Sequence, residues 1–314
     1  MSLFLVLALA QSAQLAQLDP LPQQHSPEIE AVLRRRDERR RAQAQQPAPA
    51  EPEQAQDDRA ALAAVVPPEI AERLAGCLAS ANADAEQGIA AARAWHEAGG
   101  GAYADQCGGY ALGKADRWAE SASAFERGAA VPSLDAVTRA RLWSQAGNAA
   151  LLAGTTARAL RAFDAALAQP LPPTLATGEI HLDRARARVA ADDQPGARAD
   201  LDKAIVMAQA DPMAWLLSAT LARRMNDLPL ARAHIQEAAR RAGNDAAVAL
   251  EEGVIDALSG TRDAAARAAF SRAKELAAPG SAIASQAQDY LAQLGDDAAP
   301  ADGATQPPAP SEGR

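Results

Sequence analysis

Apolar residues recur with a helical period through the middle of the chain. Ile70, Leu74 and Leu78 are spaced four apart, which places their side chains on one face of an α-helix over 68–81. A second run of the same kind covers 85–98, after a short polar break. Segments with the Val/Ile/Tyr alternation of strands are scarce, so the pattern predicts an all-α protein.

The helix-pair pattern repeats along the chain. Ala185, Ala219 and Gly253 lie 34 residues apart, and Gly109 and Gly147 precede them at steps of 38. In each unit this small residue falls in a first helix, and a second helix carries one large apolar residue between two small ones. The large residues are Phe125, Phe163, Leu201, Ile235 and Phe270. A small residue lets two helices approach closely and the large one fills the space between them, so five stacked pairs are predicted.

Residues suited to a helix end separate the two helices of a unit. Gly154, Asp192, Asn226 and Gly260 occupy this place, and an aspartate follows the middle two. Glycine and asparagine end helices through the left-handed conformation, and aspartate caps the helix that follows. These residues predict a tight turn within each pair.

The repeat resembles the tetratricopeptide repeat, a 34-residue helix–turn–helix unit with a W-x2-L-G-x2-Y motif followed by A-x3-F. Trp143 and Gly147 match the first part in one unit, and Ala159 and Phe163 match the second. The resemblance implies an α-solenoid of stacked helix–turn–helix pairs, with five repeats over 102–280.

The sequence departs from the family motif at the eleventh position of the first helix, where the tyrosine is absent. The residues there are Leu112, Ala150, Arg188, Ala222 and Asp256. The third unit is the poorest match, because Arg184 and Arg188 replace the expected leucine and tyrosine. A first helix rotated in phase would explain that mismatch.

Further segments flank the five repeats. Residues 68–101 are predicted to form a degenerate N-terminal helix pair and 281–295 a C-terminal capping helix, which an open solenoid needs for solubility. Beyond them the chain is poor in large apolar residues. There we expect a signal peptide over 1–19, a Pro/Gln/Arg-rich linker with one exposed helix over 20–67, and a disordered acidic tail over 296–314.

A short apolar run over 3–10 ends in a small-x-small pattern, as in a signal peptide before its cleavage site. No basic residue precedes the run, so a frayed amphipathic N-terminus is the alternative. Export would place the protein in the periplasm of a bacterial cell envelope, and without export it would be cytoplasmic.

Composition narrows the class of partner. About a quarter of the 314 residues are alanine and only 4% are aromatic, so helices must pack through small side chains, with the four tryptophans as expected core fillers. The net charge is −9 and three lysines are present, which argues against a nucleic-acid partner. No apolar run approaches the roughly 18 residues of a membrane span. A protein or peptide partner is therefore expected.

No motif indicates catalysis, a cofactor or a metal site. The four histidines, His25, His96, His181 and His234, are scattered, and no phosphate-binding loop is present. We expect a non-enzymatic protein without cofactors.

Cys77 and Cys107 are the two cysteines, and they lie at comparable places in the first helices of consecutive units. Stacked helices run about 8–10 Å apart, so the two side chains can meet. In an exported protein we expect a disulfide bond, and in the cytoplasm two small buried thiols.

By resemblance to the family, a partner would bind a concave groove lined by the first helices. The side chains expected there include two tyrosines and an excess of arginine, which suits an extended peptide with acidic groups. The groove candidates are Tyr103, Tyr110, Arg141, Asn148, Arg186, Arg223 and Arg224. Only Asn148 matches the carboxylate clamp of chaperone-type members, so that clamp is not expected. A solvated face without a ligand is the alternative.

The sequence favours a protein–protein interaction scaffold that acts through this groove in the cell envelope. A second hypothesis is a structural or regulatory subunit that acts through the Arg-rich run 34–41, with the solenoid as a spacer. If the first helix of the third unit is rotated, Arg186 turns into the packing interface and Arg184 or Arg188 takes its place in the groove.

Overall fold

The computed structural model describes residues 68–260 and 262–295. They divide into two compact units, the first ending at Ala242 and the second beginning at Gly243. All regular structure in these ranges is helical, so the prediction of an all-α solenoid of helix pairs is confirmed. The expectations for 1–67 and 296–314 (signal peptide, linker with its helix, and acidic tail) lie outside the described residues.

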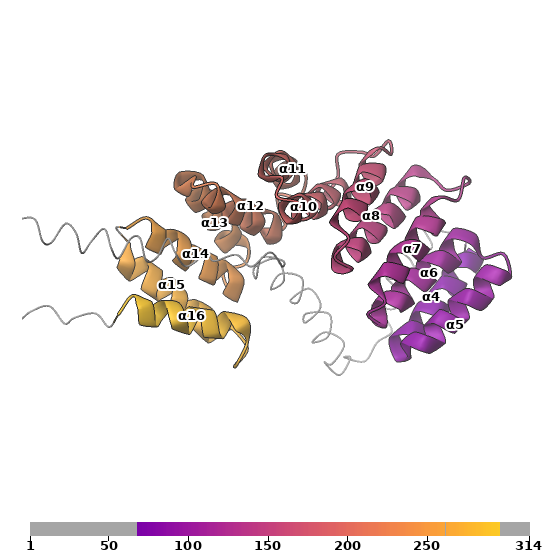
Figure 1. Cartoon of the computed structure of the whole chain (residues 1–314), viewed down its shortest axis with the longest axis horizontal. Coiled ribbons are helices and arrows are strands. Elements are labelled where there is room, and N and C mark those ends of the chain that lie inside the picture. Colours follow the sequence, from indigo (N-terminus) through magenta and orange to yellow (C-terminus); the bar gives the residue numbers. More distant parts are fainter. Residues whose placement is uncertain (1–67, 261, 296–314) are drawn as a thin grey trace, which may run out of the picture. The chain divides into compact units, whose positions relative to one another are not determined.

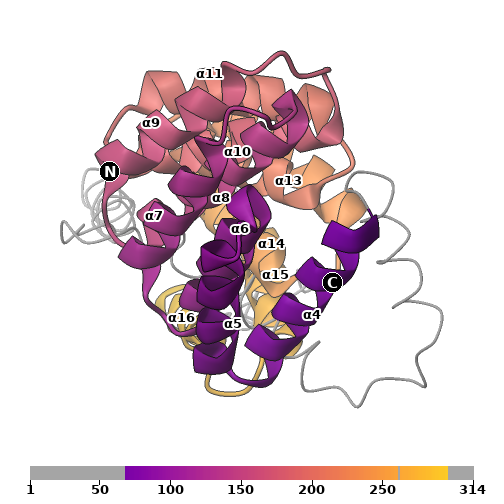
Figure 2. The same ribbon diagram turned by 90° about the vertical axis from the view of Figure 1, so that its right-hand side faces the viewer.

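The described part of the first unit, from residue 68 onwards, consists of five successive helix pairs. Figures 1 and 2 show the two helices of each pair lying side by side. The pairs are α4 (Pro68–Ala83) with α5 (Ala85–Glu97), α6 (Gly101–Lys114) with α7 (Trp118–Ala129), α8 (Ala136–Leu152) with α9 (Thr156–Leu167), α10 (Leu175–Ala190) with α11 (Gln194–Met207), and α12 (Pro212–Arg224) with α13 (Leu228–Arg241).

The second unit holds one further pair and a final helix. They are α14 (Ala246–Leu258), α15 (Asp263–Leu276) and α16 (Ala282–Gln293). Tyr290 of α16 stacks on Phe270 of α15, with ring centroids 5.0 Å apart. The final helix thus covers the apolar face of the pair before it, as a capping helix does.

The repeating small residue of the first helix is the closest point of each pair. A Cβ atom on Gly147 would lie 2.7 Å from the ring of Phe163, and one on Gly253 would lie 2.5 Å from the ring of Phe270. Ala185 and Ala219 occupy the same place and are buried. The predicted contact points are therefore confirmed, and any larger residue there would overpack the pair.

Two adjacent residues make the turn within a pair. Asp192 and Asn226 have φ values of 60° and 61°, and Gly154 has a φ of 72°. The next residue then caps the second helix: the Asp193 carboxylate accepts a hydrogen bond from the Gly196 amide at 2.9 Å. One helix therefore ends and the next begins within two residues, as the sequence predicted.

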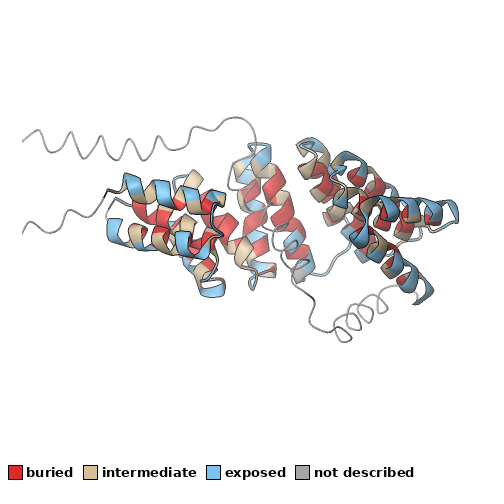
Figure 3. Cartoon of the chain, turned by 90° about the horizontal axis from the view of Figure 1, so that it is seen from below, coloured by how far each residue is buried: buried red, intermediate tan, exposed pale blue. Residues whose placement is uncertain are grey.

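The core is built from alanine and a few large side chains. Figure 3 shows buried residues on the helix sides that face neighbouring helices, with exposed residues on the opposite sides. Phe163, Leu142 and Leu201 are almost fully buried. Trp95 is buried and Trp143 packs half-buried against the core, as expected of core fillers. Trp118 and Trp215 are also half-buried.

The two cysteines meet between the first helices α4 and α6. The Cα atoms of Cys77 and Cys107 are 6.2 Å apart and their sulfur atoms lie within bonding distance. Both residues are buried beside Leu74 and Trp95. A bond at this point ties the N-terminal helix pair to the first of the five repeats.

Candidate functional site

The seven groove candidates all lie on the first helices of the first unit, and we call the surface they form the first-helix face. Their exposure differs widely. Arg141 is exposed, while Tyr103, Tyr110, Asn148, Arg223 and Arg224 are half-buried and Arg186 is buried. The candidates on α6, α8, α10 and α12 are therefore unequal as contacts for a partner.

Two of these side chains bond to a neighbouring first helix. The Tyr110 hydroxyl donates to Asn82 Oδ1 of α4 at 2.5 Å. The Asn148 amide donates to Asp183 Oδ2 of α10 at 2.6 Å. The sequence analysis did not find Asn82 or Asp183, because partners 28 and 35 residues away leave no local signal. Part of the first-helix face therefore holds repeats together.

Arg186 is a correction to the expected groove. Its residue exposure is 4%, and Nη1 pairs with Asp183 Oδ1 at 2.6 Å. Asp183 is also the acceptor for Asn148, so one carboxylate joins α8 to a buried cation on α10. The prediction that Arg186 faces solvent is wrong, since it packs between first helices.

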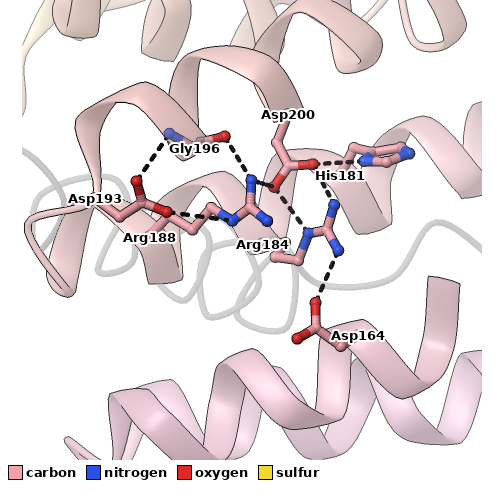
Figure 4. Close-up of polar contacts among 7 residues, drawn as sticks. All are labelled: Asp164, His181, Arg184, Arg188, Asp193, Gly196 and Asp200. Atoms are coloured by element: carbon pink, nitrogen blue, oxygen red, sulfur yellow. Dashed lines mark hydrogen bonds and ion pairs between the residues drawn. The ribbon is translucent and has the colours of Figure 1, made fainter. Parts of the chain in front are cut away.

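Arg184 and Arg188 do not replace Arg186 on that face. Both point from α10 towards α11, where they meet the carboxylate of Asp200 (Figure 4). Arg184 donates to Asp200 from Nε at 2.8 Å and from Nη2 at 2.6 Å, and Arg188 Nη1 lies 3.2 Å from Asp200 Oδ2. His181 Nδ1 is 2.8 Å from Asp200 Oδ1. We call these four residues the charge network.

The centre of the charge network is closed to water, while the side chains of Arg184 and Arg188 are 13% and 24% exposed. Asp200 is 1% exposed and His181 is buried. Burial by itself would raise the pKa of the Asp200 carboxyl, but hydrogen bonds from His181 and Arg184 and the charges of Arg184 and Arg188 lower that pKa to about 2. The carboxylate is therefore charged at neutral pH, and its partners balance the charge.

The charge network also reaches the preceding repeat. Arg184 Nη1 lies 2.8 Å from Asp164 of α9, and Arg188 Nη1 donates to the Gly196 carbonyl at 2.7 Å. Arg184 thus bonds to α11 in its own pair and to α9 in the pair before it.

One small pocket opens beside Arg186, where the first helices α10 and α12 meet the second helix α11. It has a volume of about 30 Å³. Its lining consists of Ala185, Arg186, Val189, Leu201, Leu217, Thr220, Leu221 and Arg224. Two groove candidates, Arg186 and Arg224, therefore flank an apolar cavity on the first-helix face. We call it the seam pocket.

Comparison with known proteins identifies the fold. No family model and no curated protein matches the sequence. Among solved structures, the PilF protein of Pseudomonas aeruginosa matches with a TM-score of 0.57 at 16% identity, over 72% of this chain and 99% of PilF. The C-terminal part of a TPR repeat-containing protein from Cytophaga hutchinsonii matches with a TM-score of 0.54 at 12% identity, over 70% and 86%. The chain has the tetratricopeptide repeat fold.

The tetratricopeptide repeats of this chain replace the missing eleventh-position tyrosine with charges at two places. Arg188 in the third repeat joins the charge network, and Asp256 in the fifth repeat pairs with Arg262 at 3.0 Å. In each case a polar residue from the following turn or second helix compensates for the lost aromatic packing. The first helix of the third repeat is therefore not rotated, and Asp200 balances the charges of Arg184 and Arg188.

Ser218 and His234 form a further polar contact within the described residues. Ser218 Oγ lies 2.7 Å from His234 Nδ1, but Ser218 is fully buried, so a substrate cannot reach its hydroxyl.

Among the described residues, no group of three or more acidic, histidine or cysteine side chains is placed to hold a metal. No helix in the same ranges is long and apolar enough to span a bilayer.

Proposed function

We propose that the protein is a non-enzymatic interaction scaffold that binds an extended segment of a partner protein along its first-helix face. The observation that carries this is the placement of Arg141, Arg223 and Arg224 at least partly exposed on that face. The chain as a whole is acidic, with a net charge of −9, so cations gathered on one face favour an acidic partner segment.

A bacterial cell envelope is the proposed setting. The apolar run over 3–10 supports export, and the cysteine pair between α4 and α6 suits an oxidising compartment. The location is tested by fractionating cells of the native host and detecting the protein in each fraction with an antibody. A protein confined to the cytoplasmic fraction would contradict it.

The binding proposal is tested by charge reversal. The full chain is used to capture partners from envelope extract, and the captured protein is then titrated in purified form. Arg141→Glu with Arg224→Glu should weaken binding about two- to tenfold, because both positions are partly exposed. Binding should also weaken as salt rises, since exposed charges are screened.

A control reverses the same number of charges elsewhere. Arg161 of α9 and Lys203 of α11 are exposed on second helices. Arg161→Glu with Lys203→Glu should leave the affinity unchanged. Equal losses in both double variants would contradict a site on the first-helix face. Binding that is lost when the run of arginines over 34–41 is changed to glutamine would favour the N-terminal segment instead.

A further inference from the structure

The N-terminal helix pair, α4 with α5, packs on α6 through a small apolar core. Of its six buried residues, Leu74 and Trp95 are large, Ala92 and Ala104 are small, and the other two are the cysteines. The half-buried residues at its edge are Ile70, Leu78, Ala91 and Tyr103. Because two large buried side chains bring little apolar burial, much of the attachment of the pair falls on the bond between the cysteines.

The polar contacts that cross from this pair to α6 and to the turn after it are open to water. They are Tyr110 with Asn82 at 2.5 Å, His96 with Asp105 at 3.1 Å and Arg117 with Glu86 at 3.7 Å. In each contact at least one side chain is exposed, so each contributes little to stability. The buried carboxylate of Asp105 also pairs with Arg127 of α7 at 2.8 Å, so it keeps a partner when the N-terminal pair is absent.

Three consecutive glycines, 99–101, join α5 to α6, and we call them the glycine joint. Gly99 has a φ of 85° and Gly101 a φ of 53°, and a Cβ atom on either would meet nothing within 4 Å. Gly100 between them lies against the ring of Trp95. Glycine has the greatest backbone freedom of any residue, so the chain can change direction here once the contacts of the pair are lost.

The next connections between pairs are stiffer. Between α7 and α8, Arg139 Nη2 donates to the carbonyls of Val131, Pro132 and Leu134 at 2.9–3.2 Å. Between α9 and α10, the connection 170–173 contains three prolines, which fix the backbone φ. The N-terminal pair therefore differs from these later pairs in having a flexible connection and a covalent tie together.

We propose that the N-terminal helix pair is a lid on α6, which the bond between Cys77 and Cys107 holds closed and which opens at the glycine joint when that bond is reduced. A dithiol reductant supplies two electrons and two protons: the S–S bond breaks, each sulfur becomes a thiol, and the dithiol becomes a disulfide. Opening exposes Cys107, which is fully buried in the closed lid, and separates Tyr110 from Asn82. This redox switch does not depend on the proposed function.

The experiment follows amide hydrogen exchange of the full chain by mass spectrometry, before and after reduction with a small dithiol under native conditions. Exchange in α4 and α5 should become about a hundredfold faster or more, because the bond no longer restrains a loop of about 30 residues in the open state. Exchange in α12 and α13 should change by less than about threefold, since these helices can open without the lid.

Variants separate the bond from the glycine joint. Cys77→Ala with Cys107→Ala should exchange like the reduced wild type, and the dithiol should have no further effect on it. Gly99→Asn with Gly101→Asn keeps residues that tolerate a positive φ but restricts the open state, so the increase on reduction should fall several-fold. Gly154→Asn is the matched control, because Gly154 also has a positive φ and free space around its Cβ position. It should leave the increase unchanged.

Each contrary outcome overturns a defined part of the inference. Unchanged exchange in α4 and α5 after reduction would show that packing alone holds the pair, and the lid would be wrong. Equal increases in α4, α5, α12 and α13 would show that the bond stabilises the whole first unit instead. A purified chain that keeps two free thiols under oxidising conditions would also overturn the switch. An increase that the two asparagine substitutions leave unaltered would overturn the glycine joint as the hinge. Circular dichroism shows whether each variant folds, and the reduced wild type tests the lid if the alanine variant does not.

Discussion

The second and third repeats solve the same packing problem with different chemistry. In the second repeat, Gly147 lets the ring of Phe163 pack against the backbone of the first helix, and the contact is apolar. In the third repeat the corresponding space holds Leu201 together with the charge network. There Asp200 forms ion pairs with Arg184 and Arg188. The fold therefore requires that the space between paired helices be filled and every buried charge be balanced, but not that the filling be aromatic.

The two solutions differ in how they fail. An apolar contact loses stability in proportion to the atoms removed or the overlap created. A buried ionic cluster loses far more when one member is removed, because the remaining charges stay buried without a partner. The third repeat should therefore be the more sensitive of the two to single substitutions and to acid.

The largest effect is expected from Asp200→Asn. The substitution keeps the shape of the side chain but leaves Arg184 and Arg188 without their shared counter-charge. Loss of one member of a buried pair typically costs about 3–5 kcal/mol, so the free energy of unfolding should fall by that order. Urea unfolding measures it. A loss below about 1 kcal/mol would mean that water reaches the arginines and that the charge network is not buried.

The cysteine pair provides a third, covalent way to join helices. Cys77 and Cys107 enclose a loop of about 30 residues, so their bond should stabilise the protein by about 3–4 kcal/mol in the chain-entropy model. Protein recovered from its host should show a mass two hydrogens lower without reductant, and reduction should lower the unfolding midpoint. Two free thiols in envelope protein would contradict both the bond and the proposed compartment.

The next largest effect is expected from acid, which should destabilise the third repeat more than the second. The pKa of Asp200 is about 2 in the folded protein and its ordinary value is 3.8, so the folded pKa is lowered. The stabilisation is then fully present above about pH 4 and is lost as the pH falls towards 2, by about 2 kcal/mol in total. Unfolding measured from pH 5 to pH 2 should show this loss in the wild type and a flatter profile in Asp200→Asn.

Gly147→Ala tests the apolar packing of the second repeat. The added Cβ would lie 2.7 Å from the fully buried ring of Phe163, so the pair must open slightly, at a cost of about 1–3 kcal/mol. Gly76→Ala in α4 is the matched control, because a Cβ there meets nothing within 4 Å. The control should gain up to about 1 kcal/mol from helix propensity. If both variants gain stability, the contact at Gly147 is looser than the structure indicates.

Sequence alone predicted the features that depend on local spacing. The small residue at Gly147 and the turn at Asp192 repeat at a fixed interval, so helix pairs and turns could be located. The burial of Arg186 could not, because Asn148 and Asp183 approach only after two helices have stacked. Arg184 and Arg188 looked like a phase error for the same reason: their counter-ion lies 12 or more residues further on, in the other helix of the pair.

The smallest net change in the free energy of unfolding is expected when the charge network of the third repeat is replaced by apolar packing like that of the second repeat. Arg184→Leu and Arg188→Tyr restore the residue types of the tetratricopeptide motif, and Asp200→Leu removes the carboxylate, so the triple variant removes the buried charges as a group. Replacing a buried ionic cluster by well-packed apolar residues is often neutral or stabilising. Here the loss of the Arg184–Asp164 contact offsets part of that gain, so the free energy of unfolding should change by no more than about 1 kcal/mol. The double variant Arg184→Leu with Arg188→Tyr, which retains Asp200, should instead be clearly destabilised, since its carboxylate keeps only His181 as a partner. If the triple variant is as unstable as the double one, the third repeat depends on its charges for more than their mutual balance, and the two repeats are not interchangeable solutions.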